Sequence, residues 1–271
     1  MFTTLLAAFT LSAPVPKLAP ELKWRFAKGD TFYVTRENDV TTIQKLSLQA
    51  EPTASTSRMV FVYQLTVMAA GEKETAIDLE FLSAERGDGG GAALEELPGL
   101  AGKKVTLTLD AAHTVTKAEG AGADGTGKLI EEDTLKHMVN DLFRAVPGKS
   151  VAQGAMWSDE QKGPVMNDVT AKRTFRGTVG EPVNGLIRLE AESEQTWTGG
   201  KGYTMTMKGE KGKRTVLFDA EAGRVRKLTD EFTLTGKHEF PQGDQFTIHI
   251  TSRDTLTYTV TDEKPKLKAK K

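Results

Sequence analysis

The sequence predicts a mainly β protein of the α+β class, in which two antiparallel β meanders flank one amphipathic helix. Apolar and polar side chains alternate along most of the 271-residue chain, which is typical of strands with one face on a core. One mid-chain segment changes to the helical period of three to four residues. Proline-rich and glycine-rich stretches separate these patterns and divide the chain into successive parts.

Composition narrows the classes of function. Hydrophobic residues make up 38% and charged residues 27%, as expected for sheets with one solvent-facing side. The formal net charge of −1 gives no general attraction for nucleic acid, so no nucleic-acid partner is expected. The chain has no cysteine, which excludes disulfides, thiolate nucleophiles, cysteine-based zinc sites and a lipidated cysteine.

The N-terminus resembles a secretory signal peptide. Residues 2–11 are uncharged and mostly apolar, and small residues follow at Ser12 and Ala13. No Lys or Arg precedes this run, and Pro14 and Pro16 lie close to any cleavage point, so a disordered or core-docked terminus is the alternative. We expect export to the periplasm or the extracellular space, with residues 1–20 forming the signal peptide and a proline-rich spacer. No transmembrane segment is expected, since a spanning helix needs about 20 apolar residues.

A first antiparallel β region is expected over residues 21–124. It begins with the turn Lys28-Gly29-Asp30 before an aromatic strand. Apolar residues then recur at every second position in three further strands. They are Met59, Phe61, Tyr63, Leu65 and Val67, then Ile77, Leu79 and Phe81, then Val105, Leu107 and Leu109.

A linker and an amphipathic helix are expected over residues 125–149. The apolar positions follow the i, i+3, i+4, i+7 rule from Leu135 to Val146, with Asp133 as the N-cap and Pro147-Gly148 ending the helix. The opposite face is expected to be solvated. It carries Lys136, His137, Asn140, Asp141 and Arg144.

A second antiparallel β region is expected over residues 150–262, followed by a disordered basic tail over residues 263–271. Ile187, Leu189 and Ala191 alternate with charged residues, and threonines alternate with apolar residues in the last two strands. Glu190, Glu192 and Glu194 share one strand face. Paired carboxylates can hold a cation or act as acid and base, but a solvated strand face neutralised by neighbouring cations is the favoured interpretation.

Motifs for catalysis are missing from the sequence. None of the four histidines has the spacing of metal ligands, and no P-loop, dinucleotide fingerprint or serine-nucleophile motif is present. His137 and Asp141 are four residues apart on the helix, so the carboxylate could orient the imidazole for base catalysis. The favoured interpretation is a surface pair. We therefore expect a protein that is not an enzyme, with no catalytic residues, metal site or cofactor.

Soft apolar residues in the second β region suggest a binding surface. Tyr203, Met205 and Met207 alternate with polar residues, and Trp197 is near them in sequence. Methionine and aromatic side chains adapt to irregular apolar ligands, so these four residues could bind an acyl chain between the sheet and the helix. The alternative is that they fill the core.

Several of these elements together resemble a known family. The order runs from Lys28-Gly29-Asp30 through a helix ending at Pro147 to Gly154 and Trp157. In this order, nearly the whole mature chain resembles an uncharacterised family of exported bacterial β-rich proteins, a domain of unknown function that supplies no catalytic residues. The residues themselves agree with this order, since Gly29 and Gly154 suit turns and Trp157 is expected to anchor the first strand after the helix. At fold level alone, the chain is similar to periplasmic lipoprotein carriers, which implies lipid binding.

The function expected from these observations is non-enzymatic binding of a hydrophobic or lipidic small molecule in the cell envelope. A structural or protein-interaction module of the envelope, using a sheet edge or the threonine-rich face, is one alternative. A hydrolase whose site is assembled from distant residues is the other. A continuous apolar cavity would favour the first, a flat exposed patch the second, and converging His, Asp or Glu the third.

Overall fold

The computed structural model describes residues 19–88, 93–120, 130–166, 168–200, 204–240 and 247–267. The expected signal peptide, most of the glycine-rich linker before the helix, Tyr203 and the last four residues of the basic tail lie outside the described residues. The predictions made for those segments therefore stay predictions.

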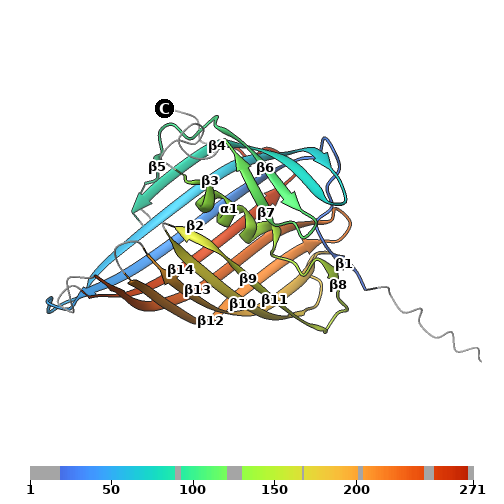
Figure 1. The fold of residues 1–271 in the computed structure, drawn as a ribbon. Coiled ribbons are helices and arrows are strands. Elements are labelled where there is room, and N and C mark those ends of the chain that lie inside the picture. Colours follow the sequence, from blue (N-terminus) through green and yellow to red (C-terminus); the bar gives the residue numbers. More distant parts are fainter. Residues whose placement is uncertain are drawn as a thin grey trace, which may run out of the picture.

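Strands dominate the described chain, with one helix between the two expected β regions (Figure 1). The elements up to the helix are β1 (Glu21–Leu22), β2 (Thr31–Leu46), β3 (Thr53–Ala70), β4 (Glu74–Asp88), β5 (Glu95–Glu96), β6 (Lys104–Asp110), β7 (Val115–Glu119) and α1 (Glu132–Phe143). Those after it are β8 (Lys149–Ser150), β9 (Met156–Met166), β10 (Val169–Val179), β11 (Ile187–Gly199), β12 (Thr204–Asp219), β13 (Arg224–Glu239) and β14 (Ile248–Thr261).

Twelve strands form one antiparallel sheet, in the order β7-β6-β4-β3-β2-β14-β13-β12-β11-β10-β9, with β5 beside β4. The prediction of a mainly antiparallel β protein with one helix is confirmed. The two expected regions do not stand as separate meanders on either side of the helix, because β2 and β14 pair along the whole of β14 and merge the regions. This long-range pairing has no local sequence signal.

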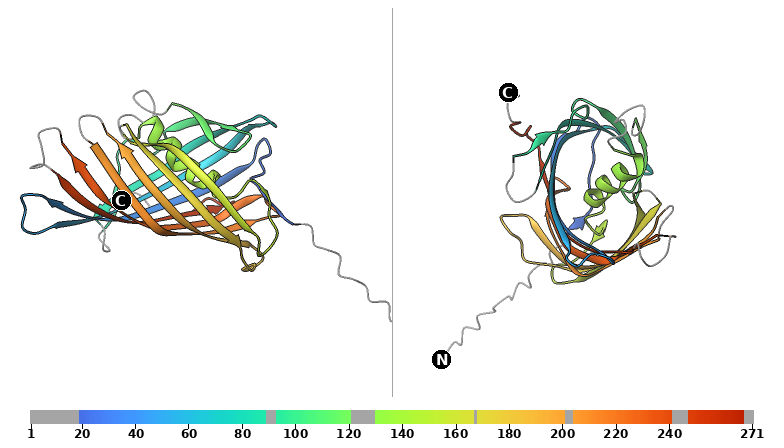
Figure 2. Two further views of the ribbon diagram at one scale, coloured as in Figure 1. Left: turned by 60° about the horizontal axis from the view of Figure 1, so that its bottom comes forward. Right: turned by 90° about the vertical axis from the view of Figure 1, so that its left-hand side faces the viewer.

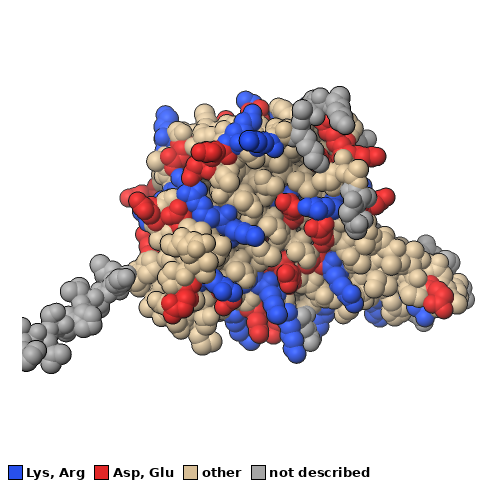
Figure 3. Space-filling model, turned by 180° about the vertical axis from the view of Figure 1, so that it is seen from behind, with Lys and Arg blue, Asp and Glu red and all other residues tan. Residues whose placement is uncertain are grey.

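The sheet curves strongly, so that its two edge strands, β7 and β9, approach each other across α1 (Figure 2). We call the side that faces α1 the inner face. Outward-facing positions carry charges of both signs, and seen from behind the molecule these are intermingled (Figure 3). The inner face holds the buried side chains, as the two-residue period of the strands predicts.

The helix lies in the opening between the two edges and contacts both β7 and β9. Its apolar side, including Leu135, Val139 and Leu142, is buried in the main core. The N-cap is Glu131 rather than the expected Asp133, which lies in the first turn, and the helix ends at Phe143, four residues before Pro147. The sequence pattern located the helix correctly but displaced both ends, because Ala145 and Val146 continue the apolar pattern without helical backbone.

Turn and packing residues lie where the sequence predicts them. Gly29 and Gly154 have φ values of 91° and 76°, a region that glycine adopts without steric cost. Trp157 on β9, the first long strand after the helix, is 5% exposed and belongs to the main core. Its indole fits against Gly177 on β10, where an added Cβ would lie 2.9 Å from the ring and 2.4 Å from the Glu190 carbonyl oxygen.

The inner face carries two separate apolar clusters. The main core packs α1 and residues of both expected regions around Trp24, Phe81 and Phe143. The second, which we call the inner apolar cluster, comprises Val169, Ala171, Met205, Met207 and Leu234, with Trp197, Phe232 and Ile250 partly buried against them. Buried charged and polar side chains also lie on the inner face, and they define the candidate site.

Candidate functional site

Charged and polar side chains on the inner face lie among the strands that also carry the two apolar clusters. We call this group the ionic belt. Each of its members is at least nine-tenths buried, although each projects from a strand or from the helix. The belt comprises Arg36 on β2, Asp141 on α1, Arg173 on β10, Gln195 on β11, Arg214 on β12 and Asp230 on β13.

Arg173 is the hub of the belt. Its Nη1 donates to Asp141 Oδ1 at 3.0 Å and lies 3.6 Å from Asp230 Oδ2, and its Nε donates to Gln195 Oε1 at 2.7 Å. Arg214 Nη2 donates to Asp230 Oδ2 at 2.7 Å. The Arg173 guanidinium on β10 thus joins the helix and β11 through charge-assisted hydrogen bonds and β13 through an ion pair.

The remaining member joins the belt to the helix through a tyrosine. Arg36 Nε donates to the hydroxyl of Tyr258 at 3.1 Å, and this hydroxyl donates to the backbone carbonyl of Met138 at 2.6 Å. Aromatic rings cover the other cations. The Arg214 guanidinium lies 3.9 Å from the ring centre of Phe175, and that of Arg173 lies 5.1 Å from Phe232.

The electrostatics of the belt favour its charged form. Burial alone would raise the pKa of Asp141, but Arg173 in particular, with His137 and Arg214, lowers that pKa below its ordinary value. Burial acts against the charge of Arg173 as well, yet Asp141 and Asp230 raise its pKa. Burial lowers the pKa of His137, Asp141 opposes this shift, and Arg173 lowers the pKa further.

The expectation of a solvated polar helix face is wrong at Asp141. Its side chain is 4% exposed, and His137 Nε2 lies 3.9 Å from Asp141 Oδ2. The pair is therefore not the surface pair that the sequence favoured. The carboxylate faces Arg173 across the gap between α1 and β10, so the helix meets the sheet with a charged group as well as with apolar ones.

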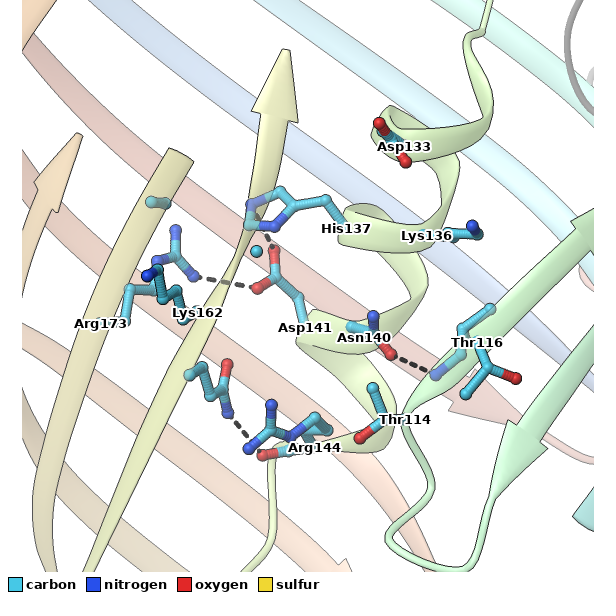
Figure 4. A pocket seen from close by; sticks show the side chains of 14 residues that line it. Thr114, Thr116, Asp133, Lys136, His137, Asn140, Asp141, Arg144, Lys162 and Arg173 are labelled. Carbon is cyan, nitrogen blue, oxygen red and sulfur yellow. Dashed lines mark hydrogen bonds and ion pairs between the residues drawn. The ribbon is translucent and has the colours of Figure 1, made fainter. Parts of the chain in front are cut away.

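A cleft of about 250 Å³ opens between α1 and β9, and we call it the helix cleft (Figure 4). Arg173 and Asp141 lie at its base, and Lys136, Asn140 and Lys162 line it. Ala171, which belongs to the inner apolar cluster, lines it too. The cleft therefore reaches both the belt and the apolar cluster from the side of the molecule.

Some polar atoms of the belt have no partner. Gln195 Nε2, Arg214 Nε and Asp230 Oδ1 are buried without a hydrogen bond to the described residues. Such atoms cost about 1–3 kcal/mol each when left unsatisfied. Other buried atoms without a hydrogen-bond partner lie outside the belt, on Trp24, Tyr63 and Trp157 among others.

The residues predicted to bind a ligand come together in part. Trp197, Met205 and Met207 all belong to the inner apolar cluster, where the methionines are buried and Trp197 is partly exposed. Tyr203 lies outside the described residues. Whether the three bind a ligand stays a prediction.

The sequence analysis missed the belt, although the signal for it was present. Arg36 continues the inward phase of Phe32 and Val34, and Arg173 sits between Ala171 and Phe175 in the same phase. A charge at the apolar phase of a strand pattern has to be buried with a partner. The partners themselves come from strands far apart in sequence, which a local pattern cannot identify.

Other predicted chemistry is not assembled by the fold. Glu190, Glu192 and Glu194 face outward and are exposed, and Arg188 pairs with Glu190 at 2.5 Å. The described part of the chain contains no group of three or more His, Asp or Glu side chains that could hold a metal ion. Within the same residues, no helix has the length and hydrophobicity to cross a membrane.

Comparisons with known proteins give no family. No family model matches the chain, and no curated protein matches it. The resemblance to a family of exported β-rich proteins is therefore confirmed only in the β-rich fold.

Solved structures that resemble the chain are all remote. Lipovitellin matches with a TM-score of 0.46 and 11% identity over 90% of this chain, which spans only 27% of the lipovitellin chain. An outer-membrane channel from Pseudomonas putida F1 matches with a TM-score of 0.24 and 9% sequence identity. The match covers 92% of this chain and all of the channel. DynF, from the dynemicin biosynthesis pathway of Micromonospora chersina, matches with a TM-score of 0.22 and 8% sequence identity. The match covers 94% of this chain and 92% of the DynF chain. With TM-scores below 0.5, these likenesses carry no argument about the fold or the activity of this chain.

Proposed function

We propose that this chain is a non-enzymatic binding protein that holds the hydrophobic part of a small molecule on its inner apolar cluster. We also propose that it works in the cell envelope, on the basis of the apolar run at residues 2–11. The single observation that supports the binding role is a second apolar cluster, on the inner face but outside the main core.

The composition of this cluster suits a ligand. Trp197, Phe232 and Ile250 remain partly exposed on the inner face, where a folding core would bury them. Met205 and Met207 lie beneath them, and their flexible thioethers adapt to apolar ligands of different shape. Acyl chains and similar apolar groups would gain about 25 cal/mol for each Å² of apolar surface removed from water.

Tryptophan fluorescence offers a direct test. The chain has three tryptophans, of which Trp24 and Trp157 are buried in the main core and only Trp197 belongs to the inner apolar cluster. We expect dodecanoate and 1-dodecanol, added below their aggregation limits, to change the emission saturably. Trp197→Phe should remove the change. A titration without saturation by either ligand would contradict the proposed function.

A matched pair of variants locates the site. Ile250→Ser removes apolar surface from the cluster and should weaken binding of both ligands by about tenfold, because most of a partly buried aliphatic side chain is lost. Ile43→Ser makes the same change on the outer face, at the residue of β2 that is paired with Thr251. Equal affinities of the two variants would place the ligand elsewhere.

A further inference from the structure

We infer that the ligand of the inner apolar cluster is an anionic amphiphile, whose acidic group is bound by Arg173 at the base of the helix cleft. This inference rests on the proposed function and adds the chemical class of the ligand. It assigns different parts of one molecule to two neighbouring surfaces. The charged head lies in the helix cleft and the apolar chain lies on the inner apolar cluster.

Arg173 has donor capacity left for a ligand. Its Nε and Nη1 are engaged by Gln195, Asp141 and Asp230, whereas its Nη2 makes no hydrogen bond or ion pair with the described residues. The residue lines the helix cleft (Figure 4). A guanidinium that is fixed on one side and uncommitted on the other is a preorganised donor for a carboxylate or phosphate oxygen.

The charge of the belt favours an anion. Within the belt, three arginines, Arg36, Arg173 and Arg214, accompany two aspartates, Asp141 and Asp230. Asp254 on β14 also interacts with Arg173, but burial raises the pKa of this carboxyl group, which disfavours its charged form. Gln195 Nε2 is a further buried donor without a partner among the described residues, whereas the unpartnered Arg214 Nε and Asp230 Oδ1 belong to groups already counted. A buried cation that exceeds its partners is costly unless an anion joins it.

The geometry connects the head to the chain. Arg173 and Ala171 are two residues apart on β10 and point to the same face, so their Cα atoms are about 7 Å apart. Ala171 lines the helix cleft and also belongs to the inner apolar cluster, with Val169 beyond it. A ligand whose head contacts Arg173 therefore has its first methylenes at the start of the cluster.

The rim of the cleft adds a second cation. Lys162 on β9 lines the cleft and has no ion pair among the residues that the structure describes. The other two cations of the rim are already neutralised locally, since Lys136 pairs with Glu132 at 2.7 Å and Arg144 approaches Asp159 at 3.4 Å. Asp133 also lines the cleft and offsets part of this positive charge. Lys162 can contact an anion at the entrance, while Arg173 binds it at the base.

Ligands that share a chain and differ in the head test the inference on the native protein. We expect dodecanoate or dodecyl phosphate to bind at least tenfold more tightly than 1-dodecanol, and dodecyltrimethylammonium to bind more weakly than 1-dodecanol. The tighter of the two anions identifies the head group. Equal affinity for all four ligands would overturn the inference and leave the proposed function standing, whereas failure of all four would overturn both.

A single charge change tests the role of the belt. Gln195→Glu keeps an oxygen that accepts from Arg173 Nε and introduces a carboxylate beside the proposed anion site. We expect dodecanoate affinity to fall by about tenfold or more and 1-dodecanol affinity to stay unchanged. Gln64→Glu is the control, because it adds the same charge on the outer face of β3.

Two readouts make these variants decisive. Near-ultraviolet circular dichroism and the urea midpoint establish that both variants keep the native fold, and a Gln195→Glu protein that fails here is replaced by the four-ligand comparison on the native chain. If Gln195→Glu loses as much affinity for 1-dodecanol as for dodecanoate, the inference is overturned. An equal loss of dodecanoate affinity in Gln64→Glu would also overturn it, by showing a general charge effect.

Discussion

At the scale of single residues, the belt shows how strongly a buried charge depends on its partner. The side chains of Arg214 and Asp230 are each 1% exposed, and their closest approach is 2.7 Å. Desolvation opposes placing both ions there, so the pair contributes little net stability by itself. Loss of one member is a different matter, because the other is left buried without its counter-ion.

Asp230→Ala should therefore destabilise the fold by about 3–5 kcal/mol, measured by urea unfolding. Replacing the whole pair with apolar residues, Arg214→Met with Asp230→Leu, should recover most of this loss. Glu37→Ala is the control, since Glu37 pairs with Arg58 at a site where its side chain is 36% exposed, and should cost about 0–1 kcal/mol. A loss in Asp230→Ala no larger than that of the control would contradict the structural role of the pair.

At the scale of elements, α1 is held to the sheet by directional bonds on two sides. Asn140 Oδ1 accepts the backbone N–H of Val115, the first residue of β7, at 2.7 Å. On the opposite side, the Tyr258 hydroxyl donates to the Met138 carbonyl, and Asp141 binds Arg173. Apolar packing fixes how deep the helix lies, whereas these bonds fix its rotation and its position along the strands.

Asn140→Ala should loosen the attachment to β7. We expect a loss of about 1 kcal/mol, because one hydrogen bond to a backbone N–H disappears. Hydrogen exchange at the Val115 amide should accelerate more than exchange in β13, which lies within the sheet. Asn38→Ala is the control, as the Asn38 side chain has no partner within the described part of the chain. Unchanged protection of Val115 would show that the bond does not restrain β7.

The helix also illustrates how far sequence patterns extend. Its existence, location and apolar side followed from the period of residues 135–146, because packing against a core requires that period. The solvated state expected for Asp141 did not follow, since burial of a polar helix face depends on Arg173, 32 residues away in another element. Similarly, Met205 and Met207 were correctly expected to share an apolar surface. The charges of the belt, however, come from four strands and the helix.

At the scale of the whole molecule, the local strand patterns predicted an antiparallel β protein but did not predict one continuous sheet. Each strand pattern specifies which face is buried and leaves open which strand lies beside it. The pairing of β2 with β14 joins residues more than 200 positions apart. It also brings Arg36 next to Tyr258, so the junction of the two regions is itself part of the belt.

The charge state of the inner face makes stability depend on pH in two directions. Attraction to Arg173 holds the folded-state pKa of Asp141 below its ordinary value. The contribution of this carboxylate to the free energy of unfolding is therefore present at neutral pH and is lost as the pH falls through the folded-state pKa. Burial raises the folded-state pKa of Asp254 above the ordinary 3.8. Its contribution is therefore fully present below 3.8 and is lost as the pH rises through the raised folded-state value.

Asp254→Asn should remove the second effect. We expect the variant to have a higher urea midpoint than the native chain at pH 7, and the advantage to shrink as the pH approaches 3.8, where the native carboxyl takes up its proton. Asp39→Asn is the control, because Asp39 lies on the outer face with its side chain 52% exposed. A constant difference between Asp254→Asn and the native chain across this range would contradict the assignment.

The position of α1 between β7 and β9 has a consequence for solubility. An uncovered edge strand presents a row of free backbone donors and acceptors, and such edges recruit further strands from other molecules. Here the same helix packs against both ends of the sheet. Displacing the helix would therefore uncover both edge strands at once, and each would offer unpaired backbone groups to a strand of another molecule.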